Sequence, residues 1–436
     1  MKKHSVLLKE ELCEGCTNCV KNCPTKAIRV RNGKARIRDE LCIDCAECIR
    51  ICAYHAKYSL TAGIADVSDY QYPIALIPPS FYGQFKGIDP AKIKNAVYRL
   101  GFKEVMDVSL AAEALSRKTS EFLAANPGVF ISSSCPVVVR LIKILYPELT
   151  EHLIPFKAPV DAMAEKARSD AAAKGVEPDE IGVFLITPCP GKNTTTFDPV
   201  GIEKSPIDKT IAVSQVYQAV LAVLDKCQDL DEENLPVPYL GLGWGQSGGE
   251  VKLLNDPIQK RSLSVSGIHR VKALLNELSR NNIKGVKYFE LAACEYGCVG
   301  GVFNVVNPFQ ARYDLRRLRA QGEQMVPQDD GRYHFKLPGK FEPLQIGQLD
   351  SNLKRAMEKL SQLEQEITVL PGLDCAACGA PDCKTLAEDI VTGLASRSDC
   401  VFLLRKQMGD LAEKLSELIH ELPPVMKNRN KHGKDR

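Results

Sequence analysis

The sequence lacks the features that mark several large classes of protein. Among its 436 residues there is one tryptophan, aromatic residues make up 6%, and 57 basic against 54 acidic residues leave a net charge of +3. No basic stripe is interleaved with aromatics, so we expect no nucleic-acid partner. No apolar run approaches the length of a membrane span, and the apolar core after Met1 is too short for a secretion signal. We therefore expect a cytoplasmic protein without a membrane span.

Nucleotide-binding motifs are missing as well. The Gly-rich segment 240–250 lacks the Lys-Ser/Thr ending of a phosphate-binding loop, and no dinucleotide fingerprint opens a βαβ unit. We interpret this segment as a tightly packed loop close to a cysteine site.

Cysteine, by contrast, is abundant. Disulfides are disfavoured in a reducing compartment, and the 17 cysteines gather at spacings typical of metal ligands. Sixteen of them fall into three groups: eight within residues 13–52, four at positions 135, 189, 294 and 298, and four within residues 375–400. Only Cys227 is left over, and it is interpreted as a plain buried thiol.

The first group consists of two Cys-x2-Cys-x2-Cys-x3-Cys runs, the first ending in Pro24 and the second in Ala53. In bacterial two-cluster ferredoxins the fourth cysteine of each run ligates the other cluster. We expect one [4Fe-4S] cluster on Cys13, Cys16, Cys19 and Cys52, and another on Cys42, Cys45, Cys48 and Cys23. A zinc module is the alternative, and two complete runs at ferredoxin spacing argue against it. Asn32-Gly33 between them predicts a hairpin.

The second group follows three apolar, strand-like stretches at 127–135, 182–189 and 286–294. Ligands of open α/β sheets gather where strands end at their carboxyl edge. The four cysteines there complete a third cubane ligand set: Cys135, Cys189, Cys294 and Cys298. Lys192 lies three residues after one of them. It is either a solvated surface lysine or a hydrogen-bond donor to an anionic ligand.

The third group has the spacing Cys375-x2-Cys378-x4-Cys383-x16-Cys400. It suits zinc or a cubane, and the neighbouring iron–sulfur sites favour a cubane. Helices are expected at 353–368 and 401–422, and 310–347 is interpreted as a linker. Of the seven histidines, His55 is the only one close to a cluster cysteine in sequence, and it is interpreted as a surface group.

Three segments resemble, in order, the signatures of the iron-only ([FeFe]) hydrogenase family. Ser132-Ser-Ser-Cys135-Pro136 resembles Thr-Ser-Cys-Cys-Pro, and Thr187-Pro-Cys189-Pro-Gly-Lys192 resembles Met-Pro-Cys-x-x-Lys. Glu290-x-x-Ala-Cys294-x3-Cys298-x-Gly-Gly resembles the third signature, Glu-x-Met-Ala-Cys-x3-Cys-x-x-Gly. The resemblance extends to about residue 320. The four-cysteine segment that follows is similar to a cubane domain of anaerobic redox proteins, and the combination resembles the family's sensory branches.

The resemblance implies an α/β multidomain chain. We expect an α+β two-cluster ferredoxin domain at 1–60 and a two-lobed α/β hydrogenase-type domain at 61–350. A small helical four-cysteine iron–sulfur module at 351–405 and a C-terminal helix with a basic tail at 406–436 would follow. It also implies that Cys298 bridges its cubane to a two-iron unit carrying carbon monoxide and cyanide. Lys192 would donate a hydrogen bond to a cyanide.

Four departures from the family pattern concern catalysis. Ser134 stands where turnover enzymes have a proton-shuttling cysteine, and a hydroxyl gives up a proton far less readily than a thiol. The family's proton-route glutamate follows an Asp-x-x-x-Ala-Ala stretch, and here Lys118 and Thr119 stand near that position. Thr187 and Ala292 replace methionines that pack on the cofactor. These departures predict slow hydrogen chemistry at best.

We therefore expect an oxidoreductase that activates hydrogen reversibly at low turnover, passes electrons through cubanes and senses hydrogen or redox state. Expected partners are hydrogen, a ferredoxin or another redox protein, and, from the family, a signalling kinase or phosphatase. One alternative is a ferredoxin-coupled hydrogenase subunit with normal turnover, its protons supplied by other acids such as Glu113. The other is a non-catalytic electron-transfer or iron–sulfur assembly protein that lacks the two-iron unit.

Overall fold

The computed structural model describes residues 4–225, 237–322, 330–344, 349–350 and 352–420. The chain divides into two compact units. The first comprises residues 1–13, 22–27 and 37–346, and the second comprises 14–21, 28–36 and 347–436. Among the described helices, none combines the length and the apolar character that crossing a membrane requires.

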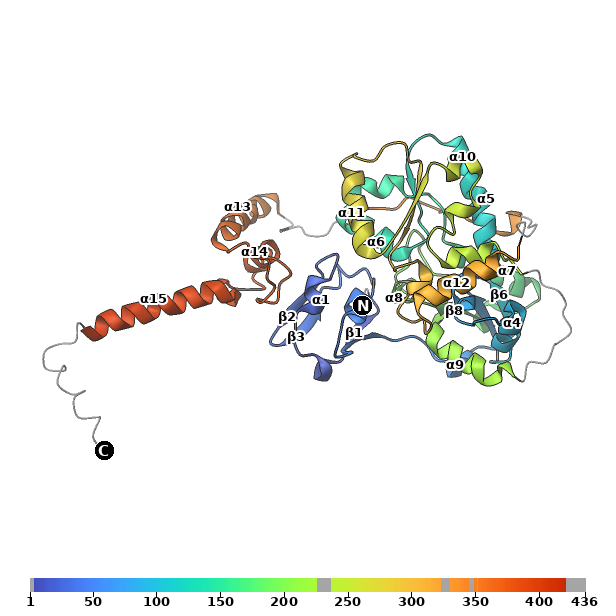
Figure 1. Cartoon of the computed structure of the whole chain (residues 1–436), viewed down its shortest axis with the longest axis horizontal. Coiled ribbons are helices and arrows are strands. Elements are labelled where there is room, and N and C mark those ends of the chain that lie inside the picture. The colour runs from blue at the N-terminus through green and yellow to red at the C-terminus, as the bar shows by residue number, and fades with distance from the viewer. Residues whose placement is uncertain (1–3, 226–236, 323–329, 345–348, 351, 421–436) are drawn as a thin grey trace, which may run out of the picture. The chain divides into compact units, whose positions relative to one another are not determined.

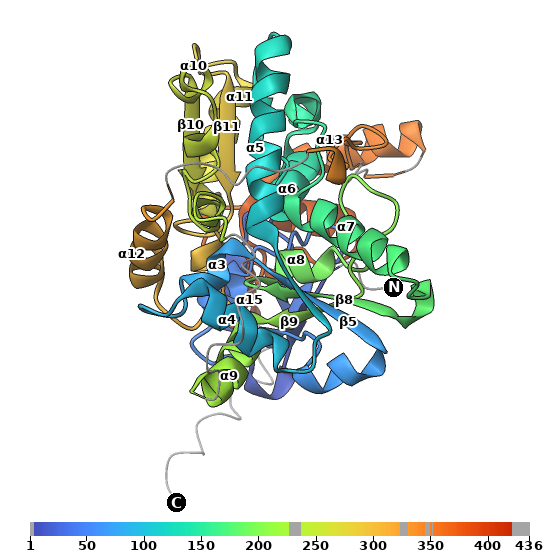
Figure 2. The same cartoon turned by 90° about the vertical axis from the view of Figure 1, so that its right-hand side faces the viewer.

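A four-stranded parallel sheet forms one layer of the first unit (Figure 2). Its strand order is β6 (Glu104–Asp107), β5 (Tyr72–Ile77), β8 (Ile181–Thr187) and β9 (Lys209–Ala212). Every residue of β8 is buried, as expected for a strand covered on both faces. Alternate residues enter two separate cores. Ala75 and Phe184 pack with α4 (Pro90–Tyr98) and α9 (Val213–Leu224), whereas Leu76 and Leu185 pack with α5 (Val108–Ala125) and α7 (Pro159–Ala173).

A second parallel sheet has the order β10 (Ser262–Ser266), β11 (Tyr288–Ala292) and β7 (Phe130–Ile131). Its apolar residues pack with α6 (Pro136–Leu145) and α11 (Ile268–Ser279). The three strands expected to lead into cysteines are thus β7, β8 and β11. The mixed α/β class is confirmed, with parallel strands in both of these sheets.

Two small antiparallel pairs come from the N-terminal part. β1 (Val6–Leu8) pairs with β4 (Lys57–Ser59) in the first unit. β2 (Ile28–Arg31) pairs with β3 (Lys34–Ile37) across the expected turn, where Asn32 and Gly33 both have left-handed backbone angles. This hairpin belongs almost entirely to the second unit.

The interpretation of 310–347 as a linker is wrong for much of that range. Its first part belongs to α12 (Pro308–Arg319), which begins after Asn307, whose side chain accepts from the Gln310 N–H at 3.0 Å. Proline at the first helical position and an asparagine cap are ordinary start signals. Both start signals, Asn307 and Pro308, lie before residue 310 and therefore outside the segment interpreted as a linker. Tyr333, Phe335, Leu337 and Phe341 are also buried. Residues 323–329 and 345–348 lie outside the described part.

The second unit contains the hairpin, α13 (Leu353–Val369), α14 (Cys383–Val391) and α15 (Val401–His420) (Figure 1). A buried ion pair joins the hairpin to α14. Arg29 donates through Nε and Nη2 to the Asp389 carboxylate at 2.6 and 3.2 Å, and Arg31 donates at 3.0 Å. The Val30 N–H also donates to the Gly379 carbonyl at 2.8 Å. A side chain at position 379 would place Cβ 2.1 Å from the Val30 oxygen, so this approach requires glycine.

We predict that Asp389→Asn detaches the hairpin from α14, because it leaves the buried Arg29 without its counter-charge. Removing one partner of a buried pair costs about 3–5 kcal/mol. Hydrogen exchange at the Val30 amide should accelerate. Glu366→Gln is the control, since the partner of Glu366, Arg397, is 52% exposed and an exposed pair contributes little to stability. Unchanged exchange across residues 28–36 in Asp389→Asn would contradict the role assigned to this pair.

Candidate functional site

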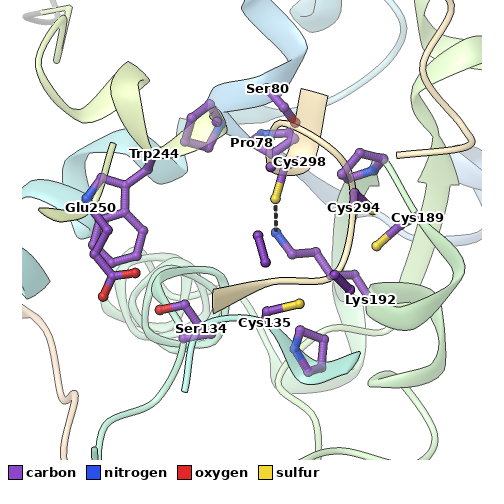
Figure 3. Close-up of a pocket in the computed structure, with 18 of the residues that line it drawn as sticks. Pro78, Ser80, Ser134, Cys135, Cys189, Lys192, Trp244, Glu250, Cys294 and Cys298 are labelled. Atoms are coloured by element: carbon purple, nitrogen blue, oxygen red, sulfur yellow. Dashed lines mark hydrogen bonds between the residues drawn. The ribbon is translucent and has the colours of Figure 1, made fainter. Parts of the chain in front are cut away.

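The site lies where strands of the two parallel sheets end. Residues after β7, β8 and β11 contribute Cys135, Cys189, Cys294 and Cys298 to one cavity (Figure 3). The cavity encloses about 1040 Å³ of space not filled by atoms, part of it open to solvent. The Gly-rich segment 240–250 lines it through Trp244 to Ser247 and Glu250, as its interpretation as a loop near a cysteine site anticipated.

Three of the four thiols, those of Cys135, Cys189 and Cys294, are poorly suited to remain as free thiolates. Burial raises the pKa of Cys135, raises that of Cys189 to about 12, and raises that of Cys294 well above its usual range. In these surroundings a thiol keeps its proton unless a cation compensates the sulfur charge. Iron ions of a cluster supply such charge, so the donor set fits a cubane.

Lys192 points into the cavity from α8 (Pro190–Thr194), so it is not the solvated surface lysine that the sequence left open. Its Nζ lies 4.0 Å from the Cys298 Sγ. Burial works to lower the pKa of Lys192, but the negative charges expected on Cys298, Cys189 and Cys135 outweigh burial and raise it. The lysine therefore stays cationic beside the sulfurs.

A buried polar atom without a hydrogen-bond partner also lines the cavity. Within the described residues the Ser80 hydroxyl is buried and has no hydrogen-bond partner, and Ser80 lines the cavity. Buried polar groups are normally satisfied, so this one indicates a ligand with an acceptor. Together with the Lys192 ammonium it suits an anionic group. The residues present thus fit a cysteine-held cluster with an anionic group beside it.

The residues that depart from the hydrogenase signatures are split between the cavity and its surroundings. Ser134 and Ala292 line the cavity. Thr187 is fully buried, and its hydroxyl donates to the Cys189 carbonyl at 3.1 Å. Lys118 pairs with Glu121 at the surface. Glu113 is buried on α5 and accepts from the Gly241 N–H at 2.8 Å.

An acid pair at the cavity wall was missed by the sequence reasoning. Ser132 donates to the Glu250 carboxylate at 2.9 Å, and the Tyr288 hydroxyl donates to it as well. Glu290 accepts from the N–H groups of Gly248 and Val251 at 2.7 and 3.0 Å. Glu290 begins the third hydrogenase-like segment, but nothing in the sequence indicates that it lies beside Glu250, 40 positions earlier.

Burial and mutual repulsion shape the ionisation of this pair. Burial, followed by the charge of Glu290, raises the pKa of Glu250 to about 8. Burial also raises the pKa of Glu290, against the opposing effect of its backbone hydrogen bonds. Two buried carboxyls this close do not both ionise readily, so the pair holds a proton near neutral pH.

The second ferredoxin set is assembled beside the cavity within the first unit. Cys23 interacts electrostatically with both Cys42 and Cys45, as does Cys48, and Cys45 also lines the cavity. The buried Arg140 interacts electrostatically with Cys42 and with Cys135, so its charge acts on both cysteine groups. Asp44 accepts from the Ser5 N–H at 3.0 Å and from the Thr194 hydroxyl at 2.8 Å, which fixes β1 to α8.

The other ferredoxin set is not assembled in one unit. Cys13 and Cys52 belong to the first unit, whereas Cys16 and Cys19 belong to the second. That ligand set remains a prediction from spacing.

Histidine placement required a correction. His55 is exposed, as interpreted, but it is not the only histidine near a cluster cysteine. His4 is buried and lies with Cys42 and Asp44, their ligand atoms within 4.8 Å of one another. The separation of 38 residues between His4 and Cys42 hid this contact from the sequence.

In the second unit, Cys378, Cys383 and Cys400 share one small core, and Cys375 is exposed. Cys378 interacts electrostatically with Cys375 and Cys400. The choice between zinc and a cubane is not decided by these contacts. Cys227 and the basic tail 427–436 lie outside the described residues.

Three family models match separate segments of the chain. Residues 71–236 match "Iron only hydrogenase large subunit, C-terminal domain". Residues 5–53 match "4Fe-4S dicluster domain", and residues 370–402 match "Putative Fe-S cluster". The parallel-sheet fold, the grouped cysteines and these matches define an iron–sulfur protein with 4Fe-4S domains. Residues 71–236 are similar to the iron-only hydrogenase family, the family that the cysteine segments resemble.

Individual relatives are more distant. The chain is 34% identical over 61 residues to an uncharacterized protein of Methanocaldococcus jannaschii. The aligned segment is 14% of this chain and 27% of that relative. Two structures of [FeFe]-hydrogenase HydA1 from Chlamydomonas reinhardtii are each 16% identical. The match to one of them, an apo form, covers 64% of this chain and 98% of the HydA1 chain, with a TM-score of 0.44. The other covers 58% and 87% with a TM-score of 0.42. Scores this low add nothing to the assignment.

We predict that the free energy of unfolding falls less between acid and alkaline pH in Glu250→Gln than in the wild-type protein. The folded protein raises the pKa of Glu250 from its ordinary value near 4.5 to about 8, so the folded state binds this proton more tightly than the unfolded state. The resulting stability is present below pH 4.5 and is lost as pH rises through about 8. The expected difference is on the order of 5 kcal/mol.

Denaturant unfolding measured at several pH values across that range tests this expectation. Glu121→Gln, at a surface carboxylate that is 63% exposed, is the control and should keep the wild-type slope. A Glu250→Gln variant with the same slope as wild type would show that Glu250 ionises normally.

Proposed function

We propose that this chain activates hydrogen reversibly, at low turnover, in the cavity formed by Cys135, Cys189, Cys294 and Cys298. These cysteines would hold a cubane, and Cys298 would also help to hold a two-iron unit carrying carbon monoxide and cyanide. When bound, that unit supplies the metal site at which hydrogen is split or formed. The observation that carries the proposal is the buried Lys192, whose Nζ lies 4.0 Å from the Cys298 Sγ.

The chain's own residues bind and orient the anionic group. The Lys192 ammonium donates from one wall, and the partnerless Ser80 hydroxyl is available from another. A charge-assisted hydrogen bond in a cavity shielded from water is stronger than one in solution. The apolar remainder of the wall, including Pro78 and Trp244, limits the approach of water.

Proton handling in this proposal shifts from position 134 to the acid pair. The Ser134 hydroxyl is a weak acid, whereas Glu250 has a pKa of about 8. Ser132 donates to Glu250 through its hydroxyl, and that same oxygen accepts from the Ser134 N–H at 3.3 Å. We infer that Glu250 stores the proton at this wall and that the absence of a thiol at Ser134 keeps turnover low.

Electrons leave in this proposal through the cluster on Cys23, Cys42, Cys45 and Cys48, because Cys45 lines the cavity. The charge of Arg140 acts on that group and on Cys135 and favours the reduced, more negative state of either cluster. A ferredoxin or another redox protein is the proposed electron partner.

Low turnover combined with a separate four-cysteine module favours sensing of hydrogen or of redox state over bulk catalysis. The signal would pass to a partner protein, for which a kinase or a phosphatase is the proposed class.

Two other functions remain as alternatives. The acid pair favours a ferredoxin-coupled hydrogenase with normal turnover, since it offers a proton route without a thiol at position 134. A non-catalytic electron-transfer or assembly protein would keep the cubane and lack the two-iron unit. The partnerless Ser80 hydroxyl favours a further ligand in the cavity, which that role does not require.

Infrared spectroscopy tests the proposed cofactor. Protein matured with its two-iron unit and exposed to hydrogen, then to inert gas, should show carbon monoxide and cyanide bands that shift between the two gases. A comparison with Lys192→Met tests the role of the lysine. The cyanide bands should shift in this variant, because the hydrogen bond from the Lys192 ammonium is lost. Absence of the bands in wild-type protein with intact cubanes and confirmed maturation would reject both hydrogenase functions and leave the non-catalytic one.

A pair of substitutions tests the proton route. Ser134→Cys should raise hydrogen turnover severalfold, because a thiol exchanges protons far more readily than a hydroxyl. Glu250→Gln should lower wild-type turnover about 100-fold, and lower it less when Ser134→Cys is also present. Turnover is measured as hydrogen oxidation against pH.

Glu121→Gln again serves as the surface control and should leave turnover unchanged. An unaltered rate in Ser134→Cys would show that this position is off the proton route. Equal losses from Glu250→Gln in both backgrounds would show that Glu250 acts in another way than by supplying protons to this wall.

A further inference from the structure

The long helix α15 (Val401–His420) packs on the small core of its unit through Leu403, and beyond its first turn it extends away from that core (Figure 1). Every side chain from residue 404 to residue 418 is exposed. Large apolar side chains are among them, with Met408 64% exposed and Leu411 59% exposed. Isolated apolar residues on a surface need no explanation, but a continuous row of them on one helix marks an interaction site.

The exposed apolar residues of α15 follow a heptad repeat. Counting from the first helical residue, the spacing alternates between three and four without a break through Val401, Leu404, Met408, Leu411, Leu415 and Leu418. A spacing that averages 3.5 residues places all six on one narrow stripe and is the pattern of a coiled coil. Charged residues take other positions, including Lys406, Asp410, Glu413 and Glu417.

The helix also needs a partner for its own stability. An isolated helix of this length is marginal in water, and most helical stability in proteins comes from packing of an apolar face. Gly409 in its middle costs about 1 kcal/mol relative to alanine. Nothing within the described chain packs on residues 404–418 to offset that cost.

We propose that α15 pairs with α15 of a second copy of this chain in a parallel two-stranded coiled coil. The first position of each heptad is Val401, Met408 or Leu415, and the fourth is always leucine, a composition that suits two strands. In a parallel, in-register pair each layer meets its own copy, so the stripe is complementary to itself. At the described flanking positions Gln407 faces Ala412 of the second copy, and no like charges oppose each other.

The other exposed apolar helix of this unit suits the stripe less well. α13 exposes Leu353, Met357, Leu360 and Ile367, but Glu364 takes the heptad position between the last two. A buried carboxylate without a partner is costly, so α13 is a poor mate for an uninterrupted leucine stripe.

The position of the stripe ties the pairing to the four-cysteine module. Cys400, the buried fourth cysteine, immediately precedes Val401, and its carbonyl accepts from the Leu404 N–H at 2.8 Å. The coiled coil therefore begins one residue after a cysteine of the module and brings two modules together at its start. This inference does not depend on hydrogen chemistry in the cavity.

Sedimentation equilibrium of the full chain over a range of micromolar concentrations tests the pairing. Wild-type protein should approach twice the 48.0 kDa mass of one chain. Leu411→Lys should weaken the association at least about 100-fold, because each copy loses a buried leucine. Leu411 is exposed in the single chain, so its replacement should leave folding intact, checked by iron–sulfur absorption and circular dichroism.

Two further variants sharpen the test. Glu413→Gln makes the same change in charge off the stripe and should associate as wild type does. Gly409→Ala should tighten association about fivefold or more by favouring the helix. The proposal would be overturned if both the wild-type protein and the Gly409→Ala variant stayed monomeric at every concentration, and α15 would then have a different partner. So would a Leu411→Lys variant that dimerises normally, since the interface would then lie elsewhere.

Discussion

The cost of burying charge governs the organisation of the first unit. Four thiols from the ends of three strands share one cavity. Burial alone would keep those of Cys135, Cys189 and Cys294 protonated. The arrangement becomes favourable when positive charge is present, and the chain supplies one buried cation, Lys192, beside the sulfurs. The strand ends, the turn before α6 and the short helix α8 all serve to bring these groups together. Iron ions of a cluster would supply the remaining charge.

The same constraint explains why proton handling need not reside at position 134. A carboxyl placed in water is a poor proton store at neutral pH, but Glu250 is buried beside Glu290 and its pKa rises to about 8. Hydrogen bonds from Ser132 and Tyr288 hold it at the cavity wall. A change from cysteine to serine in one signature is therefore insufficient to decide activity. The wall opposite Lys192 has to be considered with it.

The second unit depends on a different interaction. The carboxylate of Asp389 is buried between Arg29 and Arg31, and the hairpin backbone adds a bond to Gly379. Such a pair is unfavourable to separate, so it fixes which hairpin edge meets α14. Beyond this small core, α15 leaves with its apolar stripe uncovered. The unit thus combines a fixed base with a helix whose stability calls for a partner.

The sequence by itself determined the cysteine groups, the strands that lead into them and the mixed α/β class, because metal-ligand spacing and apolar strands are local patterns. It also determined the heptad spacing of α15. Only the tertiary structure decided that Lys192 faces the sulfurs, that Glu250 meets Glu290, that His4 lies beside Cys42 and that Arg29 meets Asp389. These contacts join residues 38 to 360 positions apart, or depend on which way a side chain turns, and no local pattern encodes either. The mistaken linker at 310–347 has the same origin, since its aromatic residues are buried by distant parts of the chain.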